Sequence, residues 1–136
     1  AFRTPSLLNV TETGPWGHAG AHTTLEGIVR YHLDPTQAYA NYDVNQLESS
    51  VQVGDMDVNT QAALAQLELL QASGDSLLVD TTLSDTNVME LVAFLSALTD
   101  PCVTTSGCIG QWVPSGTDEN PDDLRVNAVN ESGDPL

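Results

Sequence analysis

The first stretch with a clear helical pattern of apolar positions begins near residue 23. Thr23 and Glu26 form a Thr-x-x-Glu capping box, which predicts a helix start at Thr23. Asp34-Pro35 predicts its end, because the residue before a proline disfavours helical backbone. The apolar stripe between these signals consists of Leu25, Ile28 and Val29.

The same reasoning predicts further helices along the chain. A short helical turn is expected at 36–42, a long helix at 59–72 before Ser73-Gly74, and a helix at 84–98 capped by Ser84. Residues 1–22 lack periodicity and predict an irregular but packed segment. We therefore expect a mostly α fold with long ordered loops, one domain over 1–100 and an extension over 101–136.

Charge narrows the classes of function. The 136 residues hold 19 Asp and Glu against 3 Lys and Arg, a formal net charge of −16. Such a surface repels nucleic acid, whose phosphates need cationic partners, and it favours cationic proteins or divalent ions. No apolar run approaches the roughly 20 residues that a membrane-spanning helix needs. Beyond 114 the sequence is acidic and rich in Pro and Gly, which predicts an irregular acidic tail.

The two cysteines, Cys102 and Cys108, are six residues apart in a loop rich in Gly, Ser and Thr. This spacing does not suit zinc, which binds pairs two to four residues apart and needs four ligands. A local disulfide is the preferred interpretation, with two unlinked thiols as the alternative. A disulfide indicates an oxidising compartment.

His32 continues the apolar stripe of the first helix, seven residues after Leu25. One interpretation is a buried, hydrogen-bonded core histidine. The other is a metal or cofactor ligand, since a neutral imidazole facing an apolar pocket is what a haem iron binds. Spacing alone does not separate the two.

Two separated motifs resemble a known family. The stretch "FRTPSLLNVTETGPWGHAGAHTTLEGIV" near the start and "LSDTNVMELVAFLSALTD" later are similar to the C-terminal haem domain of the bacterial di-haem cytochrome c peroxidases, which include the MauG-type enzymes. The resemblance implies a cytochrome c-like helical haem domain. It also implies a c-type di-haem oxidoreductase that reduces hydrogen peroxide or oxidises a partner protein.

The resemblance implies roles for individual residues. In the family the distal axial ligand of the C-terminal haem follows the histidine of the P-[YW]-x-H motif by fourteen residues, which leads from His18 to His32. The family has Met or Tyr at that position, so a histidine is a departure. Imidazole is a stronger donor than a thioether and should lower the haem potential.

Other positions follow from the same motifs. Calcium in this family is bound by backbone oxygens that correspond to Thr13 and Pro15, although an ordinary turn at Gly14-Pro15 explains these residues as well. Arg3 matches a basic position that could pair with a haem propionate, whereas Leu8 replaces a family arginine. His18 is expected near the haem edge, Trp16 and Tyr31 are candidate oxidisable aromatics or core residues, and His22 falls outside the pattern as a surface residue.

No C-x-x-C-H haem-attachment motif is present in the sequence. We therefore expect haem c to be attached to a haem-bearing N-terminal remainder of the same protein, against which this chain packs, and we expect no catalytic acid or base here. The expected partners are an electron-donor cytochrome or an oxidisable protein, in a bacterial periplasm or outside the cell. A non-enzymatic haem electron-transfer or assembly module is the alternative, and a helical acidic domain without haem is a third possibility.

Overall fold

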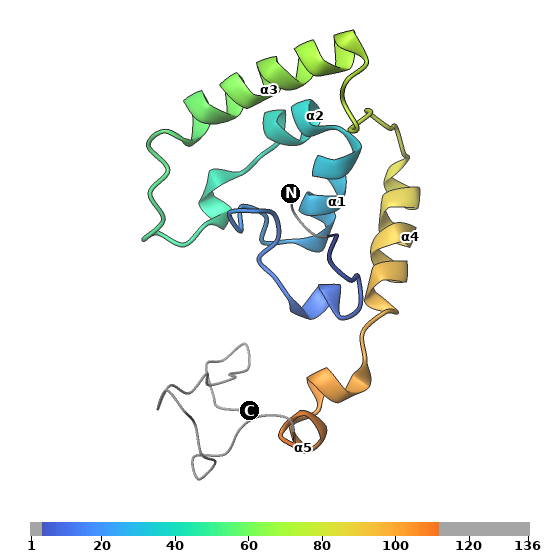
Figure 1. The fold of residues 1–136 in the computed structure, drawn as a ribbon. Coiled ribbons are helices and arrows are strands. Elements are labelled where there is room, and N and C mark those ends of the chain that lie inside the picture. The colour runs from blue at the N-terminus through green and yellow to red at the C-terminus, as the bar shows by residue number, and fades with distance from the viewer. Residues whose placement is uncertain (1–3, 112–136) are drawn as a thin grey trace.

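The computed structural model describes residues 4–111, and they form a mostly helical fold (Figure 1). Among these residues there is no strand, and one isolated antiparallel bridge joins Trp16 to His22. This confirms the helical class. The helical elements are η1 (Val10–Glu12), α1 (Leu25–Leu33), α2 (Pro35–Ala40), η2 (Val44–Gln46), α3 (Met56–Ser73), α4 (Asp85–Ser96), η3 (Pro101–Thr104) and α5 (Ser106–Ile109).

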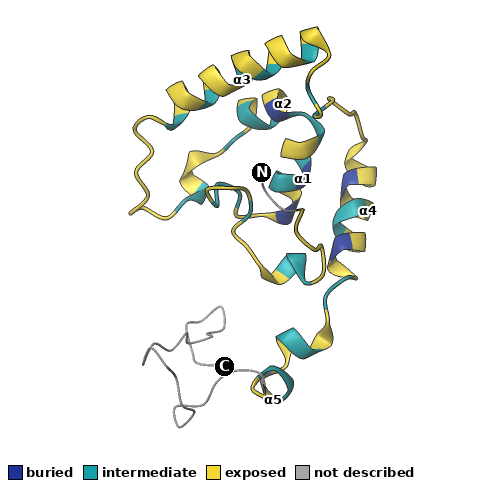
Figure 2. Ribbon diagram, viewed as in Figure 1, coloured by how far each residue is buried: buried dark blue, intermediate teal, exposed yellow. Residues whose placement is uncertain are grey.

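The core lies between α1 and α4, which run antiparallel to each other (Figure 1). Four apolar residues there are buried, and they are marked dark blue on the facing sides of the two helices in Figure 2. These residues are Leu25, Val29, Val88 and Leu95. The apolar stripe predicted from the sequence therefore does face the core. At the other end of α1, the Thr81 amide donates to the Leu33 carbonyl at 2.7 Å and brings α4 back alongside.

The N-terminal loop closes one end of this helix pair. Val10 and Trp16 pack against the core, and the Trp16 indole donates to the Val10 carbonyl at 2.8 Å. A Cβ on Gly14 would lie 2.9 Å from the Trp16 ring, so only glycine allows the indole to cover the backbone there. The Asn9 amide donates to the Leu98 carbonyl at 3.2 Å, and Asn9 Oδ1 accepts from the Asp100 amide at 2.7 Å. The segment before α1 is thus packed, as the sequence predicts.

The α2–α3 pair is built differently. Asp34 caps α2 by accepting from the Gln37 amide at 2.8 Å. None of the 18 residues of α3 is buried, and the helix runs along the outside of the fold (Figures 1 and 2). It ends at Gly74, whose φ of 80° is the left-handed conformation that terminates many helices. Polar contacts join the two helices, with the Tyr39 hydroxyl donating to Asp57 and the Gln61 amide donating to Tyr39 Oη at 3.1 Å.

Two helix starts differ from the sequence prediction. Helix α1 is capped by Thr24, whose side chain accepts from the Gly27 amide at 3.1 Å, rather than by Thr23. Thr23 instead donates through its amide and hydroxyl to Gln46 Oε1, so a long-range contact outweighs the local capping box. Helix α3 begins three residues earlier than expected, at Met56. The expected Ser84 cap of α4 is confirmed, since it accepts from the Asn87 amide.

The cysteine prediction is confirmed, because Cys102 and Cys108 form a disulfide that links η3 to α5. Arg3 and the acidic tail lie outside the described residues, so their predicted roles are not tested. No helix in the described part of the chain is long and apolar enough to cross a membrane.

Candidate functional site

His32 lies in the last turn of α1, beyond the part of the helix that the core covers. Its side chain is exposed, whereas Leu25 and Val29 on the same stripe are each 8% exposed. The interpretation of His32 as a buried core histidine is therefore wrong. His32 Nδ1 lies 2.9 Å from the Ile28 carbonyl oxygen of the preceding turn.

This hydrogen bond fixes the state of the imidazole. A carbonyl oxygen only accepts, so Nδ1 must carry the proton that it donates, and the lone pair then resides on Nε2. In metal-binding histidines the second ring nitrogen commonly makes such a contact to a backbone carbonyl, which orients the ring. His32 therefore has the protonation and exposure that a ligand histidine requires.

A continuous row of four rings leads away from His32. The Tyr31 ring meets His32 edge-on with centroids 5.5 Å apart, and it contacts His22 at 5.4 Å with a tilt of 44°. His22 in turn meets Tyr42 edge-on at 5.8 Å. The Tyr42 hydroxyl donates to the Ala21 carbonyl, which holds this ring against the loop that carries His22. We call Tyr42, His22, Tyr31 and His32 the ring row.

The ring row corrects the expectation that His22 is a surface residue. Its side chain is partly buried between two tyrosines that come from α1 and from the end of α2. Burial lowers the pKa of His22 below its usual value, and the nearby His32 lowers it further. His22 is consequently neutral at neutral pH.

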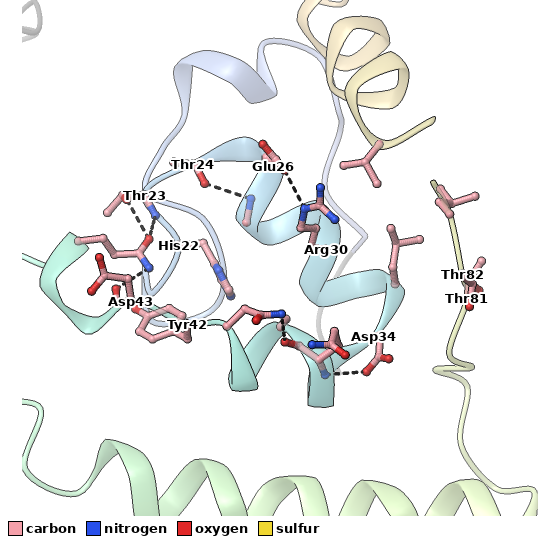
Figure 3. Close-up of a pocket in the computed structure, with 18 residues that line it drawn as sticks. His22, Thr23, Thr24, Glu26, Arg30, Asp34, Tyr42, Asp43, Thr81 and Thr82 are labelled. Atoms are coloured by element: carbon pink, nitrogen blue, oxygen red, sulfur yellow. Dashed lines mark hydrogen bonds and ion pairs between the residues drawn. The ribbon is translucent and has the colours of Figure 1, made fainter. Parts of the chain in front are cut away.

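His22 and Tyr42 also line an open cleft with a volume of about 610 Å³ (Figure 3). The cleft is bounded by α1 and α2 on one side and by the extended segment that holds Thr81 and Thr82 on the other, with both tyrosine and histidine rings at the loop end (Figure 3). Its lining is polar, including carboxylates, amides and hydroxyls. We refer to this space as the α1–α2 cleft.

Arg30 is the only Lys or Arg among residues 4–111, and it lines this cleft. Its guanidinium contacts Glu26 at 2.7 Å and Asp85 at 2.8 Å, the latter in the first turn of α4. Hydrogen bonds to Asp85 and then to Glu26 raise the pKa of Arg30. The arginine therefore ties α1 to α4, and its charge is already balanced by two carboxylates.

The remaining predicted site residues are dispersed. Trp16 packs against the core, which matches its interpretation as a core residue, while Tyr31 is 41% exposed beside His32. His18 is exposed on the loop between Trp16 and α1. Leu8, which replaces a family arginine, is 66% exposed.

The predicted calcium position, Thr13 and Pro15, lies in a turn whose Gly14–Pro15 peptide bond is cis. Both residues line a second open cavity together with Glu12 and Glu48. The described residues contain no cluster of three or more His, Cys, Asp or Glu side chains that could hold a metal ion. Backbone carbonyls are not part of such clusters, so calcium at Thr13 and Pro15 stays a prediction.

Sequence reasoning missed the part that His22 and Tyr42 play. They are twenty residues apart, and neither belongs to a periodic pattern or a motif. Their contact depends on the turn after α2 folding back onto the loop before α1. Only the long-range bond from Thr23 to Gln46 and the one from Tyr42 to Ala21 establish that path.

Comparison with known proteins gives one informative similarity. No family model matches the chain, and no solved structure matches it. The chain is 33% identical over 99 residues, 73% of its length, to the methylamine utilization protein MauG of Paracoccus denitrificans (strain Pd 1222). It spans only 23% of that protein's length. The chain is thus similar in sequence to part of MauG.

Proposed function

We propose that this chain is the C-terminal part of a c-type di-haem peroxidase-like oxidoreductase, in which His32 is the distal axial ligand of a haem held by another part of the protein. The observation that carries the proposal is the exposed His32 imidazole with Nδ1 bonded to the Ile28 carbonyl. The similarity to part of MauG and the motifs around His18 support the same assignment.

The residues present fit a haem at this position. His32 Nε2 makes no hydrogen bond within residues 4–111, so its lone pair is available to an iron. The adjoining part of α1 carries Ile28, which is only partly covered, so an apolar ring could pack beside the imidazole. Bound there, a haem would supply an iron that changes its oxidation state by one electron.

The chain's own residues would hold and tune that group. The Ile28 carbonyl keeps Nδ1 protonated and prevents the imidazole from turning about its ring axis. The Tyr31 ring stands edge-on to His32 and excludes water from one side of it. Arg3 is proposed to pair with a haem propionate, and the carbonyls of Thr13 and Pro15 to bind calcium.

Charge supports the proposed partner. Arg30, the one Lys or Arg in the described part, is neutralised internally, so the carboxylates that remain give this surface a strong negative potential. We propose a basic electron-donor cytochrome or an oxidisable basic protein as the partner, in an oxidising compartment such as the periplasm. The disulfide is consistent with that compartment.

The test uses the intact haem-carrying protein with His32→Met, His32→Leu and the control His18→Gln. We expect His32→Met to restore a ligand and raise the reduction potential of one haem, because a thioether favours the reduced iron. His32→Leu should produce a five-coordinate, high-spin signal in electron paramagnetic resonance, and His18→Gln should leave the ligation unchanged. Identical spectra for wild type and His32→Leu would contradict the proposal.

Peroxide addition separates the enzyme from a non-enzymatic haem module. The imidazole ligand, stronger than the family's thioether, and Leu8 in place of arginine are the two features that favour the module. Spectral oxidation of the ferric protein by hydrogen peroxide, with turnover of peroxide, establishes the enzyme. An unchanged spectrum establishes the module.

A further inference from the structure

The α1–α2 cleft and the ring row meet at His22 and Tyr42. Both side chains line the cleft, and both belong to the row of rings that ends at His32 (Figure 3). No centroid-to-centroid step in the row exceeds 5.8 Å. A molecule seated in the cleft against Tyr42 would therefore be connected to His32 by rings in contact.

The lining defines what the cleft can bind. Its charged groups are the carboxylates of Glu26, Asp34 and Asp43 and the guanidinium of Arg30, which two carboxylates already neutralise. A neutral His22 adds no positive charge. An anionic ligand would be repelled, whereas a neutral or cationic one would be accepted.

The shape and the hydrogen-bonding groups favour a small aromatic ligand. A volume of about 610 Å³ is within the range of small-molecule sites, and it is far too small for a protein partner. The rings of His22 and Tyr42 offer edges and faces against which an aromatic ring packs. Hydroxyls and amides around them, such as those of Thr82 and Asn41, can bind ring substituents.

We propose that the α1–α2 cleft binds a small neutral or cationic aromatic electron donor, of the hydroquinone or phenylenediamine class, whose electron reaches the His32-bound haem through Tyr42, His22 and Tyr31. This inference rests on the proposed function, because it needs a haem at His32. It adds a small organic reductant to the protein partners proposed above.

The step is balanced for a hydroquinone. One hydroxyl O–H bond breaks, its proton leaves to water through the open side of the cleft, and the donor becomes a neutral radical. The single electron reduces the haem iron from ferric to ferrous. A second donor molecule delivers the second electron of a two-electron cycle in the same way.

Binding is tested first, independently of turnover, by aromatic nuclear magnetic resonance of the intact protein with haem kept reduced by an external reductant. Hydroquinone and tetramethyl-p-phenylenediamine should shift the ring signals of His22 and Tyr42, and the anion ferrocyanide should not. Thr82→Trp, which places a large side chain in the cleft, should abolish the shifts. Asn59→Trp on the exposed side of α3 is the matched control and should preserve them.

Electron delivery is tested second, by stopped-flow reduction of the ferric protein. Tyr42→Leu removes a ring of the row, and we expect reduction by hydroquinone to slow at least tenfold while the haem spectrum stays that of the wild type. Reduction by a basic cytochrome should be unchanged. Equal rates of hydroquinone reduction in wild type, Tyr42→Leu and Thr82→Trp would overturn the proposal, as would an absence of ring shifts at His22 and Tyr42.

The two proposals fail separately. If His32→Leu leaves haem ligation unchanged, the proposed function fails while ring shifts in the cleft are still measurable. If ligation changes but the cleft gives no shifts, only the inference about the small donor fails.

Discussion

The α1–α4 pair and the α2–α3 pair are both helix–helix contacts, yet they are held by different forces. The first buries Leu25, Val29, Val88 and Leu95 between its helices. The second buries no residue of α3, and hydrogen bonds among Tyr39, Asp57 and Gln61 connect its helices. Burial of apolar surface stabilises far more than exposed polar contacts do. The α1–α4 pair should therefore carry most of the stability, and α3 should be the region that opens first.

The largest expected effect is on the core of the first pair. Leu95→Ala removes a side chain that is 8% exposed, and we expect a loss of about 3 kcal/mol in the free energy of unfolding. Leu69→Ala on α3 is the matched control, because Leu69 is 72% exposed, and it should cost less than about 0.5 kcal/mol. Urea denaturation measures both. Equal losses would show that α3 is covered by something else in solution.

Helix caps give a smaller contrast. Ser84 caps α4 by accepting from the Asn87 amide, so Ser84→Ala should lower the free energy of unfolding by about 1 kcal/mol. Asp55 precedes α3 without any side-chain cap bond, and Asp55→Ala should cost only a few tenths of a kcal/mol through the helix dipole. Thermal unfolding of the two variants separates these values. A larger loss for Asp55→Ala would contradict the assigned caps.

A local change in the second pair should leave global stability nearly intact. Tyr39→Phe removes the hydroxyl that donates to Asp57, so the amides of α3 should exchange with deuterium several-fold faster. Amides of α1 and α4 should keep their wild-type protection. Tyr31→Phe is the control, since it keeps the ring and lies outside the α2–α3 contact. Uniformly faster exchange in all four helices would refute a local role for Tyr39.

The smallest expected effect is a difference in pH response. The hydrogen bond to Asp57 raises the pKa of Tyr39, so its contribution is complete below pH 10, the usual tyrosine value, and is lost as pH rises through the raised value. Burial lowers the pKa of His22, so its contribution is complete above pH 6.5 and is lost as pH falls through the lowered value. Exchange in α3 should accelerate at alkaline pH, and the loop around His22 should loosen at acid pH. His22→Asn should remove the acid-side change and leave the alkaline one.

The difference between the pairs also explains what the sequence could reveal. The apolar spacing of Leu25, Ile28 and Val29 located α1 and its core face, because burial follows periodicity. Asp34-Pro35 and Gly74 marked helix ends through backbone preferences that act locally. The Cys102–Cys108 disulfide was likewise readable from spacing.

Long-range polar contacts were not readable in this way. Thr23 satisfied the rule for a cap, but a bond to Gln46 engaged it instead, and Thr24 became the cap. The exposure of His32 depends on how far α4 covers α1, which periodicity does not specify. The ring row depends on Tyr42 reaching Ala21, a contact between segments that share no pattern.

The engagement of Arg30 gives the protein a built-in proteolytic reporter. The chain contains no lysine, and the Arg30–Tyr31 peptide bond is the sole tryptic cleavage point within residues 4–111. That bond lies inside helix α1, and its arginine is clasped by Glu26 and Asp85, so a protease can cut there only after α1 has unwound. The appearance of two fragments split at this bond would thus clock the opening of the core itself, with no label or substitution required.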